Sequence, residues 1–320
     1  MDIFITLDYE LYMGKRTGSV ENCLLKPVEE LLALGLKHKI KFTFFVDAAY
    51  LYRLSLLRKD YPTLDCDYRK VCNNIKSIEQ QGHDIQLHFH PQWLFSEYDG
   101  REWIMNMHYY KISDVEPEYL RIAFSKSKAL LESIISKEII AFRAGGYSLQ
   151  TFTDYCSLFV ENNIKLDSSV LMNSSCKSEF QEYDYSGILD DSIYRFNDDV
   201  CKLSKKGLFT EAAIATKTVS FLSYLVYRLF VKIRYRNNDS FGDGLSVVSS
   251  RRRKVKLSKQ VKASIDHFEV YFLKRFIRRN GNLVVIGHPK NLSVDSIHYL
   301  DCIFSKMIGV HRFKTISELL

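Results

Sequence analysis

The sequence predicts one α/β domain whose sheet is mostly parallel. Short apolar segments alternate along the chain with helical patterns, and no repeat or Pro/Gly/Ser-rich linker divides residues 1–320. Such alternation lays neighbouring strands in the same direction, with helices covering the sheet. Hydrophobic residues make up 46% of the chain and charged residues 26%, which is typical of a globular protein rather than a disordered or membrane-embedded one.

Each element is expected from its local pattern. Strands are expected at the short apolar or β-branched segments Ile3–Leu7, Lys41–Val46, Ile85–His90, Ile139–Arg143, Ile164–Asp167 and Leu283–His288. Helices are expected where apolar residues recur with helical spacing, at 27–36, Asp67–Gln81, Glu116–Lys137, Phe152–Asn162, Ser258–Arg279 and Val294–Met307. Pro27 and Pro117 stand where proline suits a first turn, and Gly82 follows a helix end.

Almost every expected strand ends on a polar side chain. These residues are Asp8, Asp47, His88, His90, Arg143, Asp167 and His288. In a parallel α/β barrel the carboxyl ends of the strands form one face, and active sites lie there. The shared position of these side chains therefore predicts a functional site at that face.

His88 and His90 are two residues apart on an expected strand, so their side chains project to the same side. Two imidazoles on one face supply half of a zinc-type site, which usually takes a third protein ligand and leaves a position open for water. The alternative is a pair of core histidines. The metal site is favoured because both residues lie at a strand end, directly before Pro91.

Two carboxylates, Asp8 and Glu10, follow the first strand at the same spacing. Paired carboxylates can divide the roles of metal ligand and general base. The imidazole of His288 also follows an apolar strand, and it can protonate a leaving amine near neutral pH. Arg143 ends a buried strand and is expected to pair with a carboxylate, for which Asp8 is the natural partner.

Taken in order, six segments resemble the motifs of the polysaccharide deacetylase superfamily over nearly the whole chain. They are Thr6–Glu10, Lys41–Val46, Gly82–His90, Phe142–Gly146, Leu166–Ser169 and Val285–His288. The resemblance implies a deformed (β/α)7 barrel and a hydrolase that removes N-acetyl groups from carbohydrate. It also implies one divalent metal, zinc first, with cobalt, nickel and manganese as alternatives. The D-x-E and L-H-x-H-P motifs are similar to those of members from surface-polysaccharide biosynthesis clusters, such as those for O-antigen or capsule.

The resemblance also implies a role for each matching residue. Asp8 is the base and Arg143 orients it, while His288 is the acid, with Asp167 tuning its pKa. The metal ligands are Glu10, His88 and His90.

Three further residues are candidates for contact with the substrate. Tyr147 follows a flexible glycine turn, Trp93 can stack on a sugar ring, and Glu211 follows another short segment. The alternatives are core packing for the tryptophan and a solvated loop for the glutamate.

Three positions depart from the family pattern. The two histidines are two residues apart instead of four, Gly145 stands where proline is usual, and Glu10 replaces an acid adjacent to Asp8. Two alternatives therefore stay open beside the deacetylase. One is an amidohydrolase acting on a small non-sugar amide, and the other is an inactive relative that binds carbohydrate.

A basic, apolar insertion at 218–256 stands out from the rest of the chain. Residues 228–256 contain nine Lys and Arg and two Asp, so the net charge of this segment, +7, equals that of the whole chain. The apolar stretch Val219–Ile233 is predicted to be a buried barrel helix or, alternatively, an interfacial helix facing anionic lipid or a lipid-linked glycan. Nucleic acid is not expected as a partner, because no recognisable nucleic-acid-binding module accompanies the patch.

The cysteines and the start of the chain point to a reducing compartment. Seven cysteines are scattered without a C-x-x-C pair, which argues against a disulfide framework or a zinc ribbon. Met1 leads straight into an apolar strand, without the basic and long apolar regions of a signal peptide. We therefore expect a cytoplasmic protein, with the basic insertion as a possible peripheral contact at the inner face of the membrane.

Overall fold

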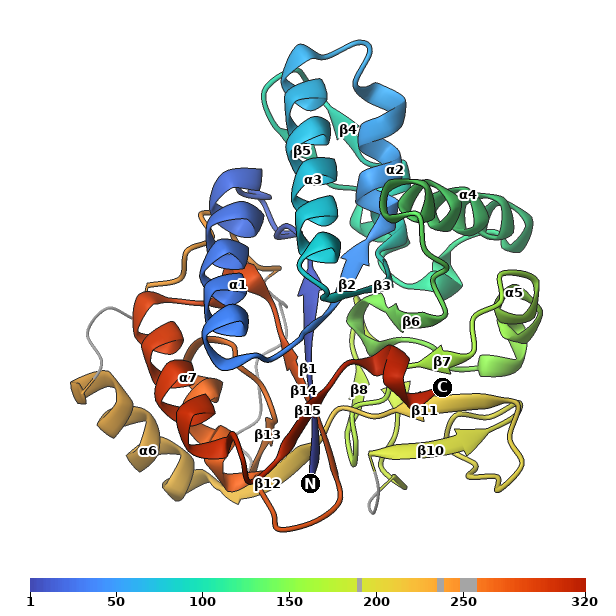
Figure 1. Cartoon of the computed structure of the whole chain (residues 1–320). Helices are drawn as coiled ribbons and strands as arrows, with labels where there is room; N and C mark the ends of the chain where they lie inside the picture. Colours follow the sequence, from blue (N-terminus) through green and yellow to red (C-terminus); the bar gives the residue numbers. More distant parts are fainter. Residues whose placement is uncertain (189–191, 235–238, 248–257) are drawn as a thin grey trace.

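A computed structural model describes residues 1–188, 192–234, 239–247 and 258–320. Within them, seven parallel strands form the barrel part of a curved, nine-stranded sheet (Figure 1). In spatial order these are β11 (Phe209–Ala212), β7 (Leu166–Asp167), β6 (Ala141–Ala144), β3 (Asp84–Phe89), β2 (Thr43–Asp47), β1 (Asp2–Tyr9) and β14 (Asn282–Gly287). Parallel pairing puts all their carboxyl ends at one end of the sheet.

The two ends of this sheet come together through Ile214, just after β11. Ile214 forms parallel bridges to Leu171 on one side and to Val284 of β14 on the other. The Ala215 N–H donates to the Val284 carbonyl at 3.2 Å, which adds a hydrogen bond across the same seam. The sheet is therefore nearly closed, and the expected deformed (β/α)7 barrel is confirmed.

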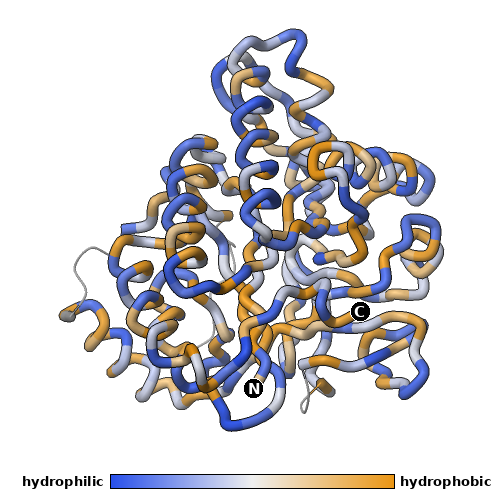
Figure 2. The backbone as a smooth tube through the Cα atoms, in the orientation of Figure 1, coloured by the Kyte–Doolittle hydropathy of each residue, from blue (hydrophilic) through white to orange (hydrophobic). Residues whose placement is uncertain are grey.

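Helices pack around the outside of the barrel, and hydrophobic residues concentrate along the central strands (Figures 1 and 2). They are α1 (Lys26–His38), α2 (Ala48–Leu57), α3 (Pro62–Gln80), α4 (Pro117–Ile135), α5 (Cys156–Glu161) and α7 (Val294–Met307). Helix α2 was not expected from the sequence. It begins where the Asp47 carboxylate accepts a hydrogen bond from the Tyr50 N–H at 3.4 Å, so this strand-end carboxylate caps a helix.

Short strand pairs decorate the loops. They are β4 (Glu97–Tyr98) with β5 (Trp103–Ile104), and β8 (Ser175–Lys177) with β9 (Glu182–Asp184). In the main sheet, β10 (Ile193–Phe196) adds an antiparallel edge strand to β11. Near the C-terminus, β15 (Arg312–Lys314) runs parallel to the first residues of β1. All seven cysteines are unpaired, as the sequence predicts.

The expected helix at Ser258–Arg279 is wrong. Its first residues form β13 (Ser258–Lys262), which pairs antiparallel with β12 (Thr216–Ser220), and its later residues form a 3-10 helix, η7 (His267–Arg275). Between them, Ile265 donates its N–H to the Ile286 carbonyl of β14 at 3.0 Å. Pairing with distant strands overrides the local helical pattern here, because local spacing carries no information about such partners.

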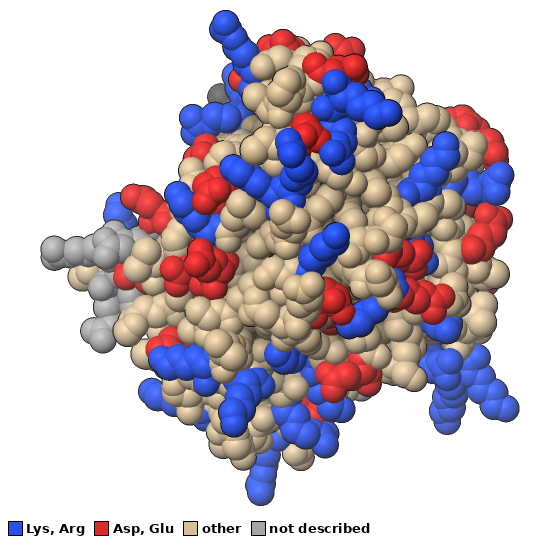
Figure 3. All heavy atoms as spheres, turned by 45° about the horizontal axis from the view of Figure 1, so that its top comes forward, with Lys and Arg blue, Asp and Glu red and all other residues tan. Residues whose placement is uncertain are grey.

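The expectation of a buried barrel helix at Val219–Ile233 is also wrong. Helix α6 (Phe221–Arg234) lies at the edge of the molecule, next to β12, and Leu222 is 72% exposed (Figure 1). The basic run at 251–256 lies outside the described residues. In the part of the chain that the structure describes, no helix is both long and apolar enough to cross a membrane. Figure 3 shows acidic and basic side chains interspersed over one face, with Lys and Arg predominating along its lower edge.

Candidate metal and catalytic site

A cavity of about 460 Å³ opens at the carboxyl ends of the barrel strands. Its lining includes the predicted residues Asp8, Glu10, His88, His90, Tyr147 and His288, together with Tyr110, Tyr183, Lys259, Lys262 and Glu269. Residues that are up to 280 positions apart in the sequence thus meet in one place, because parallel strands bring their ends to one face.

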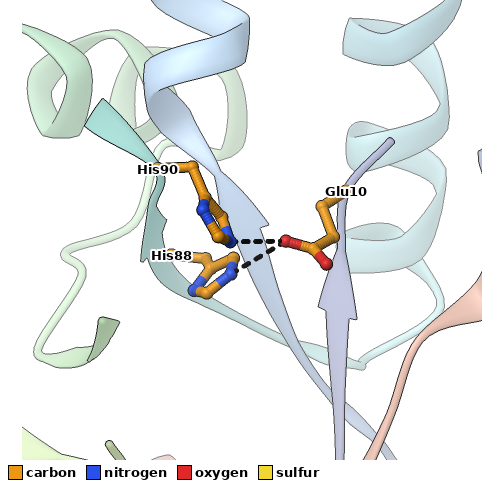
Figure 4. A group of neighbouring side chains, drawn as sticks. All are labelled: Glu10, His88 and His90. Carbon is orange, nitrogen blue, oxygen red and sulfur yellow. Dashed lines mark hydrogen bonds and ion pairs between the residues drawn. The ribbon is translucent and has the colours of Figure 1, made fainter. Parts of the chain in front are cut away.

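Glu10, His88 and His90 form a compact cluster (Figure 4). The Oε2 atom of Glu10 lies 3.1 Å from His88 Nε2 and 2.8 Å from His90 Nε2. The two imidazole rings come from the same side of β3 and its end, with centroids 4.7 Å apart and planes nearly perpendicular. The two-residue spacing therefore places both rings on the same side of the strand, as predicted from the alternation of side chains.

The donor set of this cluster fits a catalytic zinc-type site. One carboxylate oxygen and two imidazole nitrogens lie within 4.8 Å of one another, which leaves a further position for water or substrate. Ligand atoms around a tetrahedral ion with bonds of about 2.0–2.1 Å are roughly 3.3 Å apart. The two distances from Glu10 Oε2 to the histidine nitrogens, 3.1 and 2.8 Å, are close to this value. These three residues can hold a divalent metal with little movement.

The orientation of the His88 ring is fixed by Nδ1, the nitrogen that does not face Glu10. His88 Nδ1 lies 2.7 Å from the carbonyl oxygen of Arg143, which can only accept a hydrogen bond. Nδ1 therefore donates to this carbonyl, which leaves Nε2 facing Glu10 as the nitrogen that would bind a metal. A backbone carbonyl that holds the outer nitrogen of a ligand histidine is a usual support for metal binding.

Gln92 supports the Nδ1 atom of His90, as the Arg143 carbonyl supports that of His88. Its side-chain amide lies 3.2 Å from His90 Nδ1, and its buried Oε1 has no hydrogen-bond partner. Exchanging the two ends of the amide lets Oε1 accept from the Nδ1–H of His90, which is the proton that a metal-ligating Nε2 requires. The buried Oε1 of Gln92 without a hydrogen-bond partner is therefore also consistent with a metal at this site.

The other carboxylate oxygen of Glu10 is held by a lysine. Lys290 Nζ donates to Glu10 Oε1 at 2.8 Å and to the Leu11 carbonyl at 2.6 Å, and its side chain is only 7% exposed. Burial opposes ionisation of Glu10, but Lys290 and His90 hold its pKa well below the usual range. Lys290 therefore keeps Glu10 ionised, with Oε2 directed at His88 and His90.

Arg143 is fully buried and orients Asp8. Its Nη1 donates to Asp8 Oδ1 at 2.6 Å, which agrees with the pairing expected from the sequence. Nη2 donates to the hydroxyls of Thr6 and Ser168, both at 2.8 Å, and Nε donates to the Ser168 carbonyl at 2.9 Å. The guanidinium also lies 4.2 Å from the centre of the Phe45 ring. Because every side of the guanidinium is engaged, the position of the Asp8 carboxylate is firmly set.

His288 is paired with Asp266, not with Asp167. Its Nδ1 lies 2.6 Å from Asp266 Oδ2, and its backbone N–H donates to Asp266 Oδ1 at 2.7 Å. Burial favours the neutral ring, but the charge and hydrogen bond of Asp266 outweigh it and raise the pKa of His288. Nε2 of the ring faces Asp8 Oδ2 and Glu10 Oε1, at 3.6 Å from each.

Asp167 and Glu211 lie side by side on β7 and β11 beneath the cavity, and both are fully buried. Both oxygens of Asp167 accept hydrogen bonds from Ser169, at 2.7 and 3.1 Å. Burial, with Asp167 as a neighbour, raises the pKa of Glu211 well above its usual range, which favours the neutral form of this carboxyl. Asp167 is therefore not in place to tune His288, and Glu211 does not line the cavity.

The aromatic residues also differ from expectation. Trp93 is fully buried and packs against Tyr50 and Trp103, with ring centroids 4.7 and 5.2 Å away, so it cannot stack on a sugar in the cavity. Tyr147 does line the cavity, as expected. It follows Gly146 in a turn where both residues have left-handed backbone, with φ of 62° and 61°. Tyr110 lies opposite, 5.5 Å from the His90 ring.

Sequence reasoning missed three residues that shape the site: Asp266, Lys290 and Lys262. Lys290 was within reach, because it follows His288 by two residues in the same strand-end segment. Asp266 and Lys262 fell in the wrongly expected helix. Only the pairing of this segment with distant strands brings Lys262 to the cavity and Asp266 to His288. Lys262 Nζ lies 3.3 Å from the Tyr147 hydroxyl and 3.9 Å from Glu269.

Sequence comparison identifies no relatives: no protein-family model matches the chain, and no curated protein matches it. By fold, it is similar to solved structures over 99% of its length. A protein from Mycobacterium smegmatis named as a polysaccharide deacetylase gives a TM-score of 0.54 at 12% identity, over 88% of that chain. Puue allantoinase gives 0.51 at 11% identity over 88% of its chain, and 4-alpha-glucanotransferase from Thermococcus litoralis gives 0.52 at 9% over 40%. At such identities the likeness shows the fold alone, and that fold is the deformed β/α barrel of polysaccharide deacetylases.

Proposed function

We propose that this protein is a metal-dependent hydrolase that removes an N-acetyl group from a sugar. One observation carries the proposal: Asp8 Oδ2 lies between the candidate metal ligands and the candidate acid. It is 4.0 Å from His88 Nε2 and 3.6 Å from His288 Nε2. A base, an acid and a metal-binding cluster around one point are what hydrolysis of an amide needs.

The metal proposed at Glu10, His88 and His90 is zinc, with cobalt, nickel or manganese as alternatives. Two imidazoles and one carboxylate suit these ions. A divalent cation held there would polarise the acetyl carbonyl and make a neighbouring water more acidic.

The residues of the chain supply the proton transfers. Asp8 takes a proton from the attacking water through Oδ2, because Oδ1 is held by Arg143. Backbone N–H groups of the turn Gly145–Tyr147 would help to bind the negative charge that develops on the carbonyl oxygen. His288, kept protonated by Asp266, gives a proton to the departing amine.

The lining of the cavity supports a sugar as substrate. Tyr110, Tyr147 and Tyr183 present aromatic rings with polar tips, and the charged side chains around them suit hydroxyl groups. We propose an N-acetylated carbohydrate from a surface-polysaccharide precursor, handled in the cytoplasm, and membership of the polysaccharide deacetylase superfamily. A small amide is the second candidate, because one solved neighbour of the same fold is an allantoinase by name.

The test combines metal content with acetate release from a panel of N-acetylated sugars and small amides. We expect about one divalent metal per chain, lost in Glu10→Ala and in His88→Ala/His90→Ala. Asp8→Asn should keep the metal and lose turnover, because Asp8 is proposed as the base and not as a ligand. Metal loss in Asp8→Asn would make Asp8 a ligand. If the purified protein takes up no metal even with added zinc or cobalt, a non-catalytic carbohydrate-binding protein is the better interpretation.

A further inference from the structure

Helix α6 presents a continuous apolar stripe to solvent. Six of its side chains are exposed by 43 to 72%, at positions that recur with helical spacing: Leu222, Leu225, Val226, Leu229, Phe230 and Ile233. Single exposed apolar residues are common on protein surfaces, but a contiguous stripe of this length is not. The stripe therefore indicates a surface that meets something other than water.

The opposite side of the helix is fixed to the barrel. Tyr224 and Tyr227 pack on Phe272 of η7, with ring centroids 6.2 and 4.2 Å apart, and Val231 is 2% exposed. Tyr227 also donates its hydroxyl hydrogen to the Tyr271 carbonyl. These contacts determine which way the helix faces, so the apolar stripe points away from the molecule.

The charged residues of the helix between 221 and 233 are all cations. Arg228 and Lys232 are exposed and follow each other by one turn along one flank, and residues 221–233 contain no Asp or Glu. Arg275 of η7 lies 5.2 Å from the ring centre of Tyr227 and adds a further cation next to the helix. An apolar stripe bordered by cations is complementary to a surface with an apolar interior and anionic headgroups.

We propose that α6 is an interfacial helix that docks the protein on an anionic membrane. Its apolar stripe is buried at the boundary of the acyl chains, and Arg228 and Lys232 lie among the lipid phosphates. The 14 residues of the helix are too few to span a bilayer, which takes about 20, so the helix lies in the plane of the membrane.

The same strand pair connects this surface to the cavity. Helix α6 follows directly on Ser220 of β12, which pairs with Ser258 at the start of β13, and Lys259 and Lys262 of β13 line the cavity. The docked helix therefore holds the cavity close to the membrane. This deepens the proposed function and rests on it: the acetylated sugar is carried on a membrane lipid.

The test is flotation of the full chain with vesicles of phosphatidylcholine alone or with phosphatidylglycerol added. We expect binding to the anionic vesicles only. The variant Leu222→Ser/Leu229→Ser/Ile233→Ser should bind about tenfold less or weaker still, because it removes apolar area. The affinity of Arg228→Glu/Lys232→Glu for the anionic vesicles should fall by about fivefold or more for each of the two substitutions. The matched control, Leu203→Ser/Leu208→Ser/Val310→Ser, changes side chains that are 62, 61 and 70% exposed elsewhere and should bind like the original protein.

Equal binding to neutral and anionic vesicles, no binding to either, or full binding by the stripe variant would each overturn the proposal. The proposal would also be overturned if the protein is a dimer in the absence of lipid and the stripe variant is a monomer. A second copy of the chain would then cover the stripe. Asp8→Asn should still float, and the stripe variant should still release acetate from a water-soluble substrate. Membrane docking and catalysis can thus fail separately.

Discussion

The backbone at Gly145 lies directly against the imidazole of His90. A Cβ atom at Gly145 would come within 2.6 Å of His90 Nδ1 and 2.7 Å of Cε1, closer than real side chains approach. The two-residue spacing of the histidines and the glycine at position 145 are thus linked. Histidines two residues apart put the second ring over the end of β6, and only glycine at position 145 leaves room for it.

Gly145→Ala should therefore displace His90 and weaken metal binding. We expect a loss of about ten- to a hundredfold in affinity, the range seen when the support of a ligand histidine is removed. Titration of the metal-free protein with zinc measures this. Gly187→Ala is the matched control, since a Cβ at that position meets nothing within 4 Å. Unchanged affinity in Gly145→Ala would show that His90 is not a ligand.

Arg143→Lys should lower the rate of acetate release by about a hundredfold or more while the metal content stays the same. The lysine keeps the charge but cannot make the four hydrogen bonds that hold Asp8 relative to Thr6 and Ser168. Steady-state kinetics on a substrate found by the acetate screen would measure it. A variant with unchanged kcat would mean that Asp8 needs no such orientation.

Asp266→Asn should move the alkaline limb of the pH–rate profile to lower pH. The pKa of His288 is raised in the folded protein by Asp266, with smaller contributions from Asp8 and Glu10, and His288 must be protonated to act as the acid. Activity is therefore lost as pH rises through that pKa, and removing the Asp266 charge lowers it. Asp167→Asn is the comparison, because Asp167 does not touch His288. If Asp167→Asn shifts the limb and Asp266→Asn does not, the assignment from the structure is wrong.

His83 should make the protein less stable as the pH falls below neutrality. Its ring stacks on Phe42 with centroids 5.3 Å apart, and Nδ1 accepts the Phe42 N–H at 3.0 Å. Burial, with Lys41 nearby, lowers the pKa of His83 to about 4. The folded state thus resists protonation that the unfolded chain accepts near pH 6.5, so stability is full above that pH and declines towards pH 4.

Urea unfolding of His83→Gln measures this contribution. Glutamine can still accept the Phe42 N–H but does not titrate, so its free energy of unfolding should fall less between pH 6.5 and 4 than that of the original protein. His108→Gln is the control, since His108 is exposed and does not share this environment. Identical pH dependence in all three proteins would contradict the role given to His83.

The sequence by itself determined the central features of the site. The spacing of His88 and His90 decides that both rings leave the same side of a strand, because side-chain direction in a strand alternates with a period of two. Polar residues at the ends of parallel strands meet at one face, so the pairing of Arg143 with Asp8 could be predicted from the sequence alone. Both are consequences of local geometry and strand direction.

Only the tertiary structure decided the surroundings of these residues. Asp266 reaches His288 through strand pairing at the closing edge of the barrel, and its local pattern had suggested a helix. Burial placed Trp93 and Glu211 beneath the surface, since a side chain's exposure depends on everything that packs on it. Likewise, the apolar composition of 219–233 was compatible with a buried helix or an exposed one. The packing of Tyr224 and Tyr227 on η7 left the other side of α6 uncovered, because a helix can bury only the side that finds a partner.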